Sequence, residues 1–381
     1  LNLLNFLNMK YRTCESVCAG HPDKICDQIS DAILDACLGV DPNSRVAIEC
    51  LIKDNHLILA GEITSNAKPD YVSIAKNVLK NIGYGESEIN NFQIQNLIGQ
   101  QSAHIAQGVD TGGAGDQGMM YGYATDETPQ MIPLPLLLSH RLCARLNELT
   151  KTQADCPLLP DGKAQVTVAY ENGIPKEIES VIVSVQHIKD ITSEDLEKYV
   201  LENVIKPICG EWFKKEFIIN PHFQNIKDDK KIKIYINPTG RFETGGPYGD
   251  CGLTGRKIAV DTYGGIGRIG GGAFSGKDAS KVDRSAAYMA RFLARQLIKL
   301  GFASEAEVRL AYAIGVSEPV DVSVEIFRGD KNREKEAGEY LRANFDLTPR
   351  GITEFLQLKK PVYSATSAYG HFGREGFEWE K

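Results

Sequence analysis

Residues 264–284 read GGIGRIGGGAFSGKDASKVDR, and the rest of the chain can be organised around them. Six glycines precede Ala273, so this backbone can take positive φ angles and come close to a bound group. The stretch also carries basic and acidic side chains, namely Arg268, Lys277, Lys281, Arg284, Asp278 and Asp283. Glycine-rich backbone beside lysines suits a polyphosphate, and interleaved carboxylates suit the Mg²⁺ that accompanies one.

Residues 271–277, GGAFSGK, satisfy most of the P-loop pattern. A P-loop continues with Ser or Thr, whereas Asp278 stands here, and no strand pattern comes directly before the glycines. We therefore interpret the stretch as a phosphate loop of another kind. The alternative is a flexible glycine linker whose charges are solvated.

Hydrophobic periodicity predicts one succession of elements three times: helix, strand, polar turn, strand, helix. The expected ranges are 23–38, 46–52, 57–64 and 74–82, then 134–149, 166–170, 176–187 and a helix capped by Thr192, then 282–300, 308–314, 320–326 and 335–345. This order predicts an α+β fold with a triplicated unit, each sheet antiparallel and covered by helices on one side. Coincidence is the alternative, because the copies share negligible sequence identity.

Glycine-rich loops near residues 107–115 and 245–249 predict the domain boundaries. We expect an N-terminal α+β domain at 9–107, a central α+β domain at 108–247 and a C-terminal α+β domain at 248–381, with chain segments exchanged between them. Residues 221–233 look like an insertion in the central domain, and their polar run 228–231 predicts an exposed hairpin tip. Residues 1–8 are expected to be an unstructured leader.

Composition narrows the class of protein. The 381 residues carry a formal net charge of −7, which argues against a general nucleic-acid binder. The nine cysteines form no C-x-x-C pair and lie mostly in apolar patterns, so we expect reduced thiols in the cytoplasm. No apolar run is long enough for a membrane span, so no membrane partner is expected.

Two further patterns carry candidate chemistry. GHPDK at 20–24 stands just before a predicted helix, where His21 could donate to a phosphate oxygen and Asp23 could bind a metal. Alternatively, Asp23 only complements the helix dipole. Glu49 and Glu62 interrupt apolar strands, which suggests a cation or an ammonium group beside each, or a strand face open to solvent.

The remaining motifs are weaker. GAGDQG at 113–118 matches G-x-G-x-x-G, but no strand precedes it, so a mobile glycine loop is favoured over a dinucleotide site. Lys163, after Asp161 and Gly162, could hold a phosphate or simply follow a turn. Phe242 could stack on a base or lie in the core. Ser280 and Asp283 fit a capping box, the structural alternative for Asp283.

Taken together, the motifs resemble those of the S-adenosylmethionine synthetase (methionine adenosyltransferase) family. The resemblance runs over residues 12–381 and rests on GHPDK at 20–24, GAGDQG at 113–118, DCGLTGRK at 250–257, GGGAFSGKD at 270–278 and AYGHFGR at 368–374. It implies three α/β-sandwich-like domains related by pseudo-threefold symmetry. It also implies that ATP and L-methionine give S-adenosylmethionine, with tripolyphosphate released and hydrolysed to diphosphate and phosphate.

The resemblance further implies two Mg²⁺ per site, K⁺, and a homo-oligomer (a dimer, or a dimer of dimers as a homotetramer) with the active site between subunits. Four residues would be catalytic, stabilising the leaving group: His21, Lys163, Arg256 and Lys277. The ATP-binding residues would add Asp161, Arg241, Phe242, Asp250, Lys257 and Ala273. Methionine would contact Glu62, Gln101, Asp250 and Lys281. Asp23 and Asp283 would hold Mg²⁺ and Glu49 would hold K⁺, while Asp116 would close on the adenosine side beside a lid at 101–115.

Overall fold

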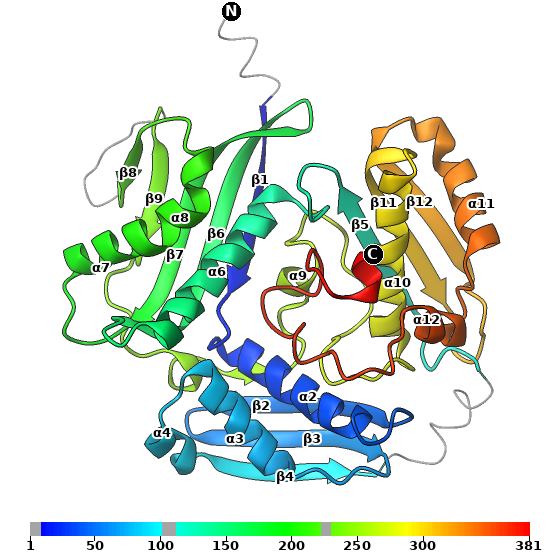
Figure 1. The fold of residues 1–381 in the computed structure, drawn as a ribbon, viewed down its shortest axis with the longest axis horizontal. Helices are drawn as coiled ribbons and strands as arrows, with labels where there is room; N and C mark the ends of the chain where they lie inside the picture. Colours follow the sequence, from blue (N-terminus) through cyan, green and yellow to red (C-terminus); the bar gives the residue numbers. More distant parts are fainter. Residues whose placement is uncertain (1–8, 101–111, 222–229) are drawn as a thin grey trace, which may run out of the picture.

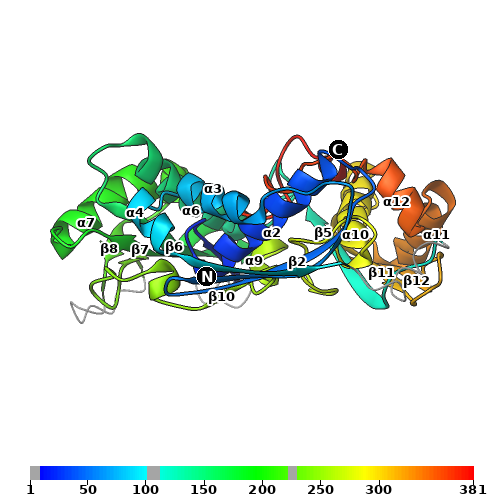
Figure 2. The ribbon, with the colours of Figure 1, turned by 90° about the horizontal axis from the view of Figure 1, so that it is seen from below.

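The computed structural model describes residues 9–100, 112–221 and 230–381, and the expected leader at 1–8 lies outside these residues. Three β-sheets lie side by side, and Figure 2 shows helices α2, α3 and α12 on one side of the molecule and strands β2, β10, β11 and β12 on the other. The predicted α+β fold with mostly antiparallel sheets and packed helices is confirmed. The narrower expectation that each sheet is antiparallel is wrong, because two of the sheets contain parallel strand pairs.

The central sheet has the strand order β1-β6-β7-β9-β8. Its bounds are β1 Met9–Val17, β6 Leu158–Glu171, β7 Ile174–His187, β8 Phe217–Ile219 and β9 Ile232–Ile236. Strands β6 and β7 form a hairpin whose turn residues, Asn172 and Gly173, both have positive φ. Strands β8 and β9 pair in parallel, so they are not the two arms of a hairpin, and the expectation of a hairpin tip at 228–231 is wrong.

The N-terminal sheet has the order β10-β2-β3-β4. Its strands are β2 Arg45–Lys53, β3 His56–Thr64, β4 Gln93–Gly99 and β10 Gly252–Leu253. The third sheet has the order β12-β11-β5, with β5 Gly118–Thr125, β11 Ala303–Tyr312 and β12 Asp321–Gly329. Strands β1, β10 and β5 thus each pair with strands distant in sequence, and segments far apart in the chain share sheets.

The helices cover the sheets, as Figure 1 shows. Their bounds are α2 Pro22–Leu38, α3 Tyr71–Ile82, α4 Glu86–Asn91, α6 Leu134–Thr152, α7 Ser193–Val200, α8 Lys206–Cys209, α9 Ile258–Asp261, α10 Val282–Lys299, α11 Glu334–Asn344 and α12 Pro349–Phe355. The predicted helices at 23–38, 134–149 and 282–300 are confirmed within three residues. Within the described part of the chain, every helix is too short or too polar to cross a bilayer.

Helix α2 positions the candidate site. Pro22 opens it with a fixed φ, and the His21 Nδ1 atom accepts a hydrogen bond from the Asp23 backbone N–H at 3.2 Å, which caps its first turn. Ile25, Ile29 and Ile33 are fully buried, in an apolar cluster shared by the N-terminal and third sheets. A second apolar cluster lies under the central sheet. Helix α2 is therefore held rigidly where the N-terminal sheet meets the C-terminal loops.

Candidate active site

Two glycine loops from the C-terminal third of the chain bind the edge of strand β2. At one end, Gly252 and Leu253 of β10 pair with Ile52 and Leu51. At the other end, Lys277 forms a β-bridge with Ala47. The two anchor points on β2 are four residues apart, or about 13 Å along the strand. Strand β2 therefore brings the motifs at 250–257 and 270–278 to one edge.

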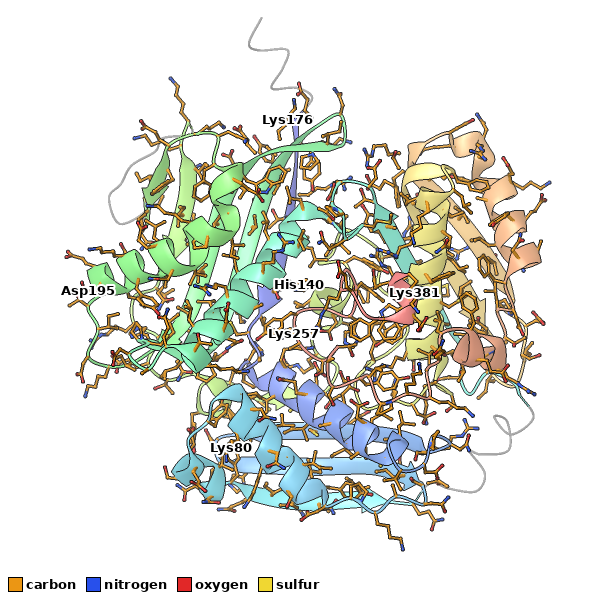
Figure 3. All side chains as sticks on the ribbon, in the orientation of Figure 1. Lys80, His140, Lys176, Asp195, Lys257 and Lys381 are labelled. Carbon is orange, nitrogen blue, oxygen red and sulfur yellow. The ribbon has the colours of Figure 1, made fainter. Side chains whose placement is uncertain are left out.

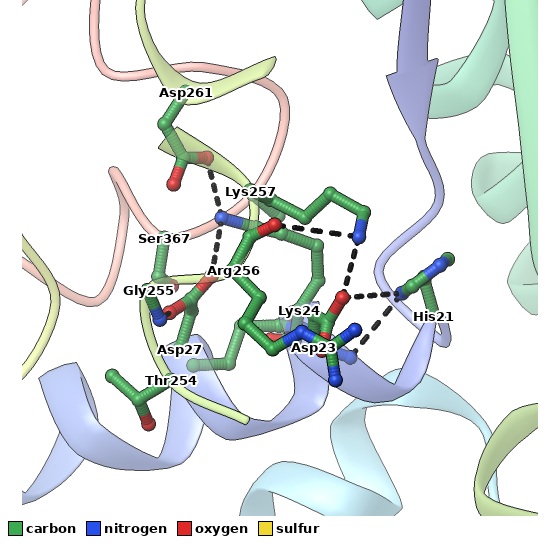
Figure 4. Close-up of polar contacts among 12 residues, drawn as sticks. His21, Asp23, Lys24, Asp27, Thr254, Gly255, Arg256, Lys257, Asp261 and Ser367 are labelled. Carbon is green, nitrogen blue, oxygen red and sulfur yellow. Dashed lines mark hydrogen bonds and ion pairs between the residues drawn. The ribbon is translucent and has the colours of Figure 1, made fainter. Parts of the chain in front are cut away.

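The first loop forms a cluster around Asp23, drawn in Figure 4. Asp23 Oδ1 accepts a hydrogen bond from the Leu253 backbone N–H at 2.9 Å, and Asp23 Oδ2 pairs with the Lys257 ammonium. The Arg256 Nε atom lies 3.9 Å from the same carboxylate. The Lys257 and Leu253 contacts hold the pKa of Asp23 below its usual value despite burial. Asp23 is therefore an ionised, buried acid among cations.

His21 lies against this cluster and is 3% exposed. Burial, and then the positive charges of Lys257 and Lys163, lower the pKa of His21 to about 3. The imidazole is therefore neutral at pH 7. Because Nδ1 accepts the Asp23 N–H, the ring proton of the neutral form is on Nε2.

Lys163, on strand β6 of the central sheet, lies near the cluster of His21, Asp23 and Lys257. It lies opposite Val17 in the β1–β6 pairing, and the Gly20 backbone N–H donates to Pro160 O at 3.2 Å. Its neighbour Asp161 is buried and accepts from the Gly246 N–H at 2.8 Å. Burial raises the pKa of Asp161, with the charge of Asp250 adding to the effect. Figure 3 shows Lys257 near the centre of the molecule.

The second loop forms another lysine–carboxylate cluster. Lys277 Nζ lies 2.8 Å from Asp283 Oδ2, while Asp283 Oδ1 accepts from the Gly272 N–H at 2.7 Å. Lys281 pairs with Asp278, whose Oδ2 accepts from the Val46 N–H at 2.6 Å. Asp283 thus contacts the glycine loop. The backbone at the start of α10 receives no side-chain cap, so the capping-box alternative does not describe this helix.

The two loops touch one another through small residues. Gly255 has a φ of +80°, and a side-chain Cβ placed on it would lie 2.3 Å from the Cβ of Ala273. The backbone of each loop thus limits the position of the other. A chain of phosphates along this edge would meet cations from both loops.

Several predicted residues lie on open surfaces. Glu49 and Glu62 are exposed on one face of the N-terminal sheet. Ala47 pairs with Lys277 on one side and with Glu62 on the other, so Lys277 and Glu62 share that face. Asp116, just before β5, is exposed, and GAGDQG leads into a strand instead of following one, unlike a dinucleotide-binding motif.

Arg241 and Phe242 contact the end of strand β7. The Phe242 backbone N–H donates to His187 Nε2 at 3.0 Å, and Arg241 donates to Lys189 O at 3.0 Å. These contacts are distinct from those of the two lysine clusters. Gln101 and most of the predicted lid at 101–115 lie outside the described residues.

The structure adds buried charged residues to which the motifs assigned no role of their own: Lys24, Asp27, Asp31, Asp261 and Arg284. The signal was present in the sequence, because aspartates recur every four residues along α2. A cavity of about 520 Å³ lies behind the second loop, between residues 42–45, 278–280 and helix α12. Lys257 and Lys277 are not among its lining residues.

A bound metal would find partial ligand sets here. Among the described residues, no group of three or more His, Cys, Asp or Glu side chains is arranged for a metal ion. Asp23 and Asp283 each offer carboxylate oxygens next to a lysine. This donor set fits Mg²⁺, which commonly takes one or two protein carboxylates and completes its shell with water and phosphate oxygens.

Comparisons with known proteins agree over almost the whole chain. Three family models match: the S-adenosylmethionine synthetase N-terminal domain at residues 9–103, the central domain at 111–242 and the C-terminal domain at 244–381. A curated relative, the S-adenosylmethionine synthase of Desulfosudis oleivorans, is 47% identical over 382 residues, covering 97% of this chain and 95% of the relative.

Proposed function

The chain belongs to the S-adenosylmethionine synthetase family and is an enzyme of S-adenosylmethionine synthesis, and from this premise we propose how its site carries out the reaction. The methionine sulfur attacks ribose C5′ of ATP, tripolyphosphate leaves whole, and the same site hydrolyses it to diphosphate and phosphate. The observation that carries the proposal is the pair of lysine–aspartate clusters on one edge of β2. Cations along an edge match an extended anionic leaving group.

The attacking step needs alignment more than acid–base chemistry. A thioether sulfur has a free electron pair and loses no proton when it attacks carbon, so a general base is unnecessary. The barrier falls when sulfur and C5′ are held in line and the charge developing on the leaving oxygen is stabilised. The protein's task is therefore to fix the triphosphate.

His21 would donate the hydrogen bond to the leaving oxygen. It is neutral because its pKa is lowered to about 3, and its ring proton is on Nε2 because Nδ1 accepts from Asp23 N–H. A neutral donor stays protonated throughout the working pH range. Lys163, Arg256, Lys257 and Lys277 would neutralise the phosphates, with Asp161, Asp250 and Ala273 shaping the site, and Arg241 and Phe242 near the adenosine.

The family is metal-dependent, and Asp23 and Asp283 would hold two Mg²⁺, which neutralise phosphate charge when bound. On binding, Lys257 and Lys277 would exchange their carboxylate partners for phosphate oxygens. Glu49 would hold K⁺. The two Mg²⁺ assignments are supported by the two carboxylate–lysine pairs, in which carboxylate oxygens lie beside the cations proposed to bind phosphate.

We further propose a homo-oligomer, a dimer or a homotetramer, with the site between subunits. The support is the open face of the N-terminal sheet, where Glu49 and Glu62 lie beside Leu97, which is 55% exposed. A second chain on this face would enclose Lys277 and Glu62. Methionine would contact Glu62, Gln101, Asp250 and Lys281, and Asp116 would close the adenosine side. All nine cysteines are free, which supports a cytoplasmic enzyme.

Product analysis tests the proposal. We expect purified protein with Mg²⁺, K⁺, ATP and methionine to yield S-adenosylmethionine by mass spectrometry, with phosphate and diphosphate in equal amounts by ³¹P NMR. Omitting methionine should leave most ATP intact. Steady release of ADP would show a kinase or simple ATPase and would contradict the proposal.

A further inference from the structure

Helix α2 carries a row of four aspartates, Asp23, Asp27, Asp31 and Asp35, spaced four residues apart and therefore on one face. Each accepts hydrogen bonds from backbone N–H groups of the C-terminal third of the chain. In order, the donors are Leu253 at 2.9 Å, Gly255 at 2.8 Å, Gly276 at 2.9 Å, and Tyr363 and Ser364 at 3.0 and 2.7 Å. The row thus holds three separate loops against one helix.

We propose that Asp27 and Asp31 are positioning residues that set where the two phosphate-binding loops lie relative to each other. Gly255 immediately precedes Arg256 and Lys257, and Gly276 immediately precedes Lys277. The two aspartates are one helical turn apart, about 6 Å along the axis. The rigid helix therefore fixes the spacing between the two sets of cations. This inference rests on the proposed function for its catalytic meaning.

The glycine at each of these two hydrogen bonds lets its loop pack closely against a second surface, which limits the position of the loop. Gly276 has a φ of +81°, and a Cβ on it would lie 2.0 Å from Ile48 O. Gly255 has a φ of +80° and is closed in by Ala273. Each loop is thus held between an aspartate of α2 and a second surface. Such a loop cannot shift without breaking a hydrogen bond to a buried carboxylate.

Basic residues offset the repulsion among the carboxylates. Lys24 Nζ lies 2.9 Å from Asp27 Oδ2 and 2.5 Å from Asp261 Oδ1. Dashed lines in Figure 4 mark both contacts. Arg284 makes two hydrogen bonds to Asp31, at 2.7 and 2.8 Å. In Asp27, Oδ2 pairs with Lys24 while Oδ1 accepts from the Gly255 N–H. In Asp31, Arg284 binds both oxygens, and Oδ1 also accepts from the Gly276 N–H. Asp27 is the cleaner residue to test, because Arg284 also binds Phe274 O and Lys277 O.

The test compares three variants. Asp27→Ala removes both the Gly255 contact and the Lys24 ion pair. Asp27→Asn keeps an oxygen for the Gly255 N–H but loses the ion pair. Asp35→Ala, the matched control from the same row, releases Tyr363 and Ser364, which are distant in sequence from both loops. Each variant is measured for thermal stability, kcat, KM for methionine, and calorimetric binding of magnesium tripolyphosphate.

We expect all three variants to have a lower melting temperature than the wild-type protein. Only Asp27→Ala should lose turnover, by about tenfold or more, because a misplacement of about 1 Å can cost a hundredfold. It should also weaken tripolyphosphate binding while KM for methionine changes by less than about twofold. Equal turnover losses in Asp27→Asn or Asp35→Ala would show a merely structural role and overturn the inference, as would wild-type turnover in Asp27→Ala.

The binding measurement separates this inference from the proposed function. If wild-type protein bound tripolyphosphate but made no S-adenosylmethionine, the proposed reaction would fail. Weaker binding in Asp27→Ala alone would still support the positioning role. Unchanged binding in Asp27→Ala would refute that role even if the wild-type protein made S-adenosylmethionine.

Discussion

Replacing Gly276 by alanine should lower turnover strongly while lowering the melting temperature by only a few degrees. A left-handed φ of +81° costs a non-glycine residue about 1–2 kcal/mol. The added methyl carbon would also lie 2.0 Å from Ile48 O, whereas real Cβ contacts are rarely below 3.0 Å. Relief requires the loop to move by about 1 Å, and such a displacement can cost about a hundredfold in rate. Lys277, the next residue, would move with it.

The assay pairs thermal melting with S-adenosylmethionine production at saturating ATP and methionine. We expect the Gly276→Ala protein to melt a few degrees lower, at about 2–4 °C per kcal/mol, with turnover reduced by about a hundredfold. Gly210→Ala is the control, because Gly210 has an α-helical φ of −59° and open space around its Cβ position. That change should stabilise the protein by about 0.4–1 kcal/mol and leave turnover unchanged. A Gly276→Ala enzyme with wild-type turnover would refute the reasoning.

Three further predictions concern charged groups. Lys277→Met should lower turnover by a factor of about 10²–10³ and change the free energy of unfolding by less than about 1 kcal/mol. Unaltered turnover would show that Lys277 does not bind the phosphates. Lys24→Met should lower the free energy of unfolding, measured in urea, by about 3–5 kcal/mol, because it leaves Asp27 and Asp261 buried without their cation. Lys53→Met, at an exposed ion pair, is the control, and a smaller loss in Lys24→Met than in this control would contradict the prediction. Burial lowers the pKa of His140 from 6.5 to about 3, so the folded state stays neutral while the unfolded state protonates. His140 should therefore reduce stability as pH falls from 6.5 towards 3, by about 1.4 kcal/mol per pH unit, and His140→Gln should flatten the urea-midpoint curve there.

The sequence predicted elements that carry their own local signals. Helix α2 was recognisable from Pro22 and the buried isoleucines, and the β2–β3 and β6–β7 hairpins from alternating strands around a polar turn. Strands β1, β5 and β10 were missed because their partners are distant. β10 has only two residues, and Gly118 and Gly122 weaken the strand signal of β5. Gly122 is required by packing, since a Cβ there would lie 1.9 Å from the backbone of Ala290.

The candidate site was predictable as a set of residues but not as an arrangement. Glycines beside lysines indicated Lys257 and Lys277 as candidate phosphate ligands. Their carboxylate partners could not be predicted, because those pairs depend on tertiary contacts. Asp23 and Lys257 are 234 residues apart. The aspartate row of α2 was visible as a four-residue repeat, but a charged stripe on a helix usually faces solvent. Only the burial of Asp27 and Asp31 shows that this stripe binds backbone from another part of the chain.

The exchange of strands explains why this site needs the whole chain. His21 follows β1, which pairs with the central sheet through Val17 and Lys163, and then enters α2, which packs on the N-terminal sheet. The loops bearing Lys257 and Lys277 come from the C-terminal third but bind the edge of β2. A fragment that lacked any one of the three sheets would therefore lack residues of the site itself. Since loop closure over such separations is entropically costly, the buried pairs of Lys24 and Arg284 form only when the N-terminal and C-terminal parts have come together.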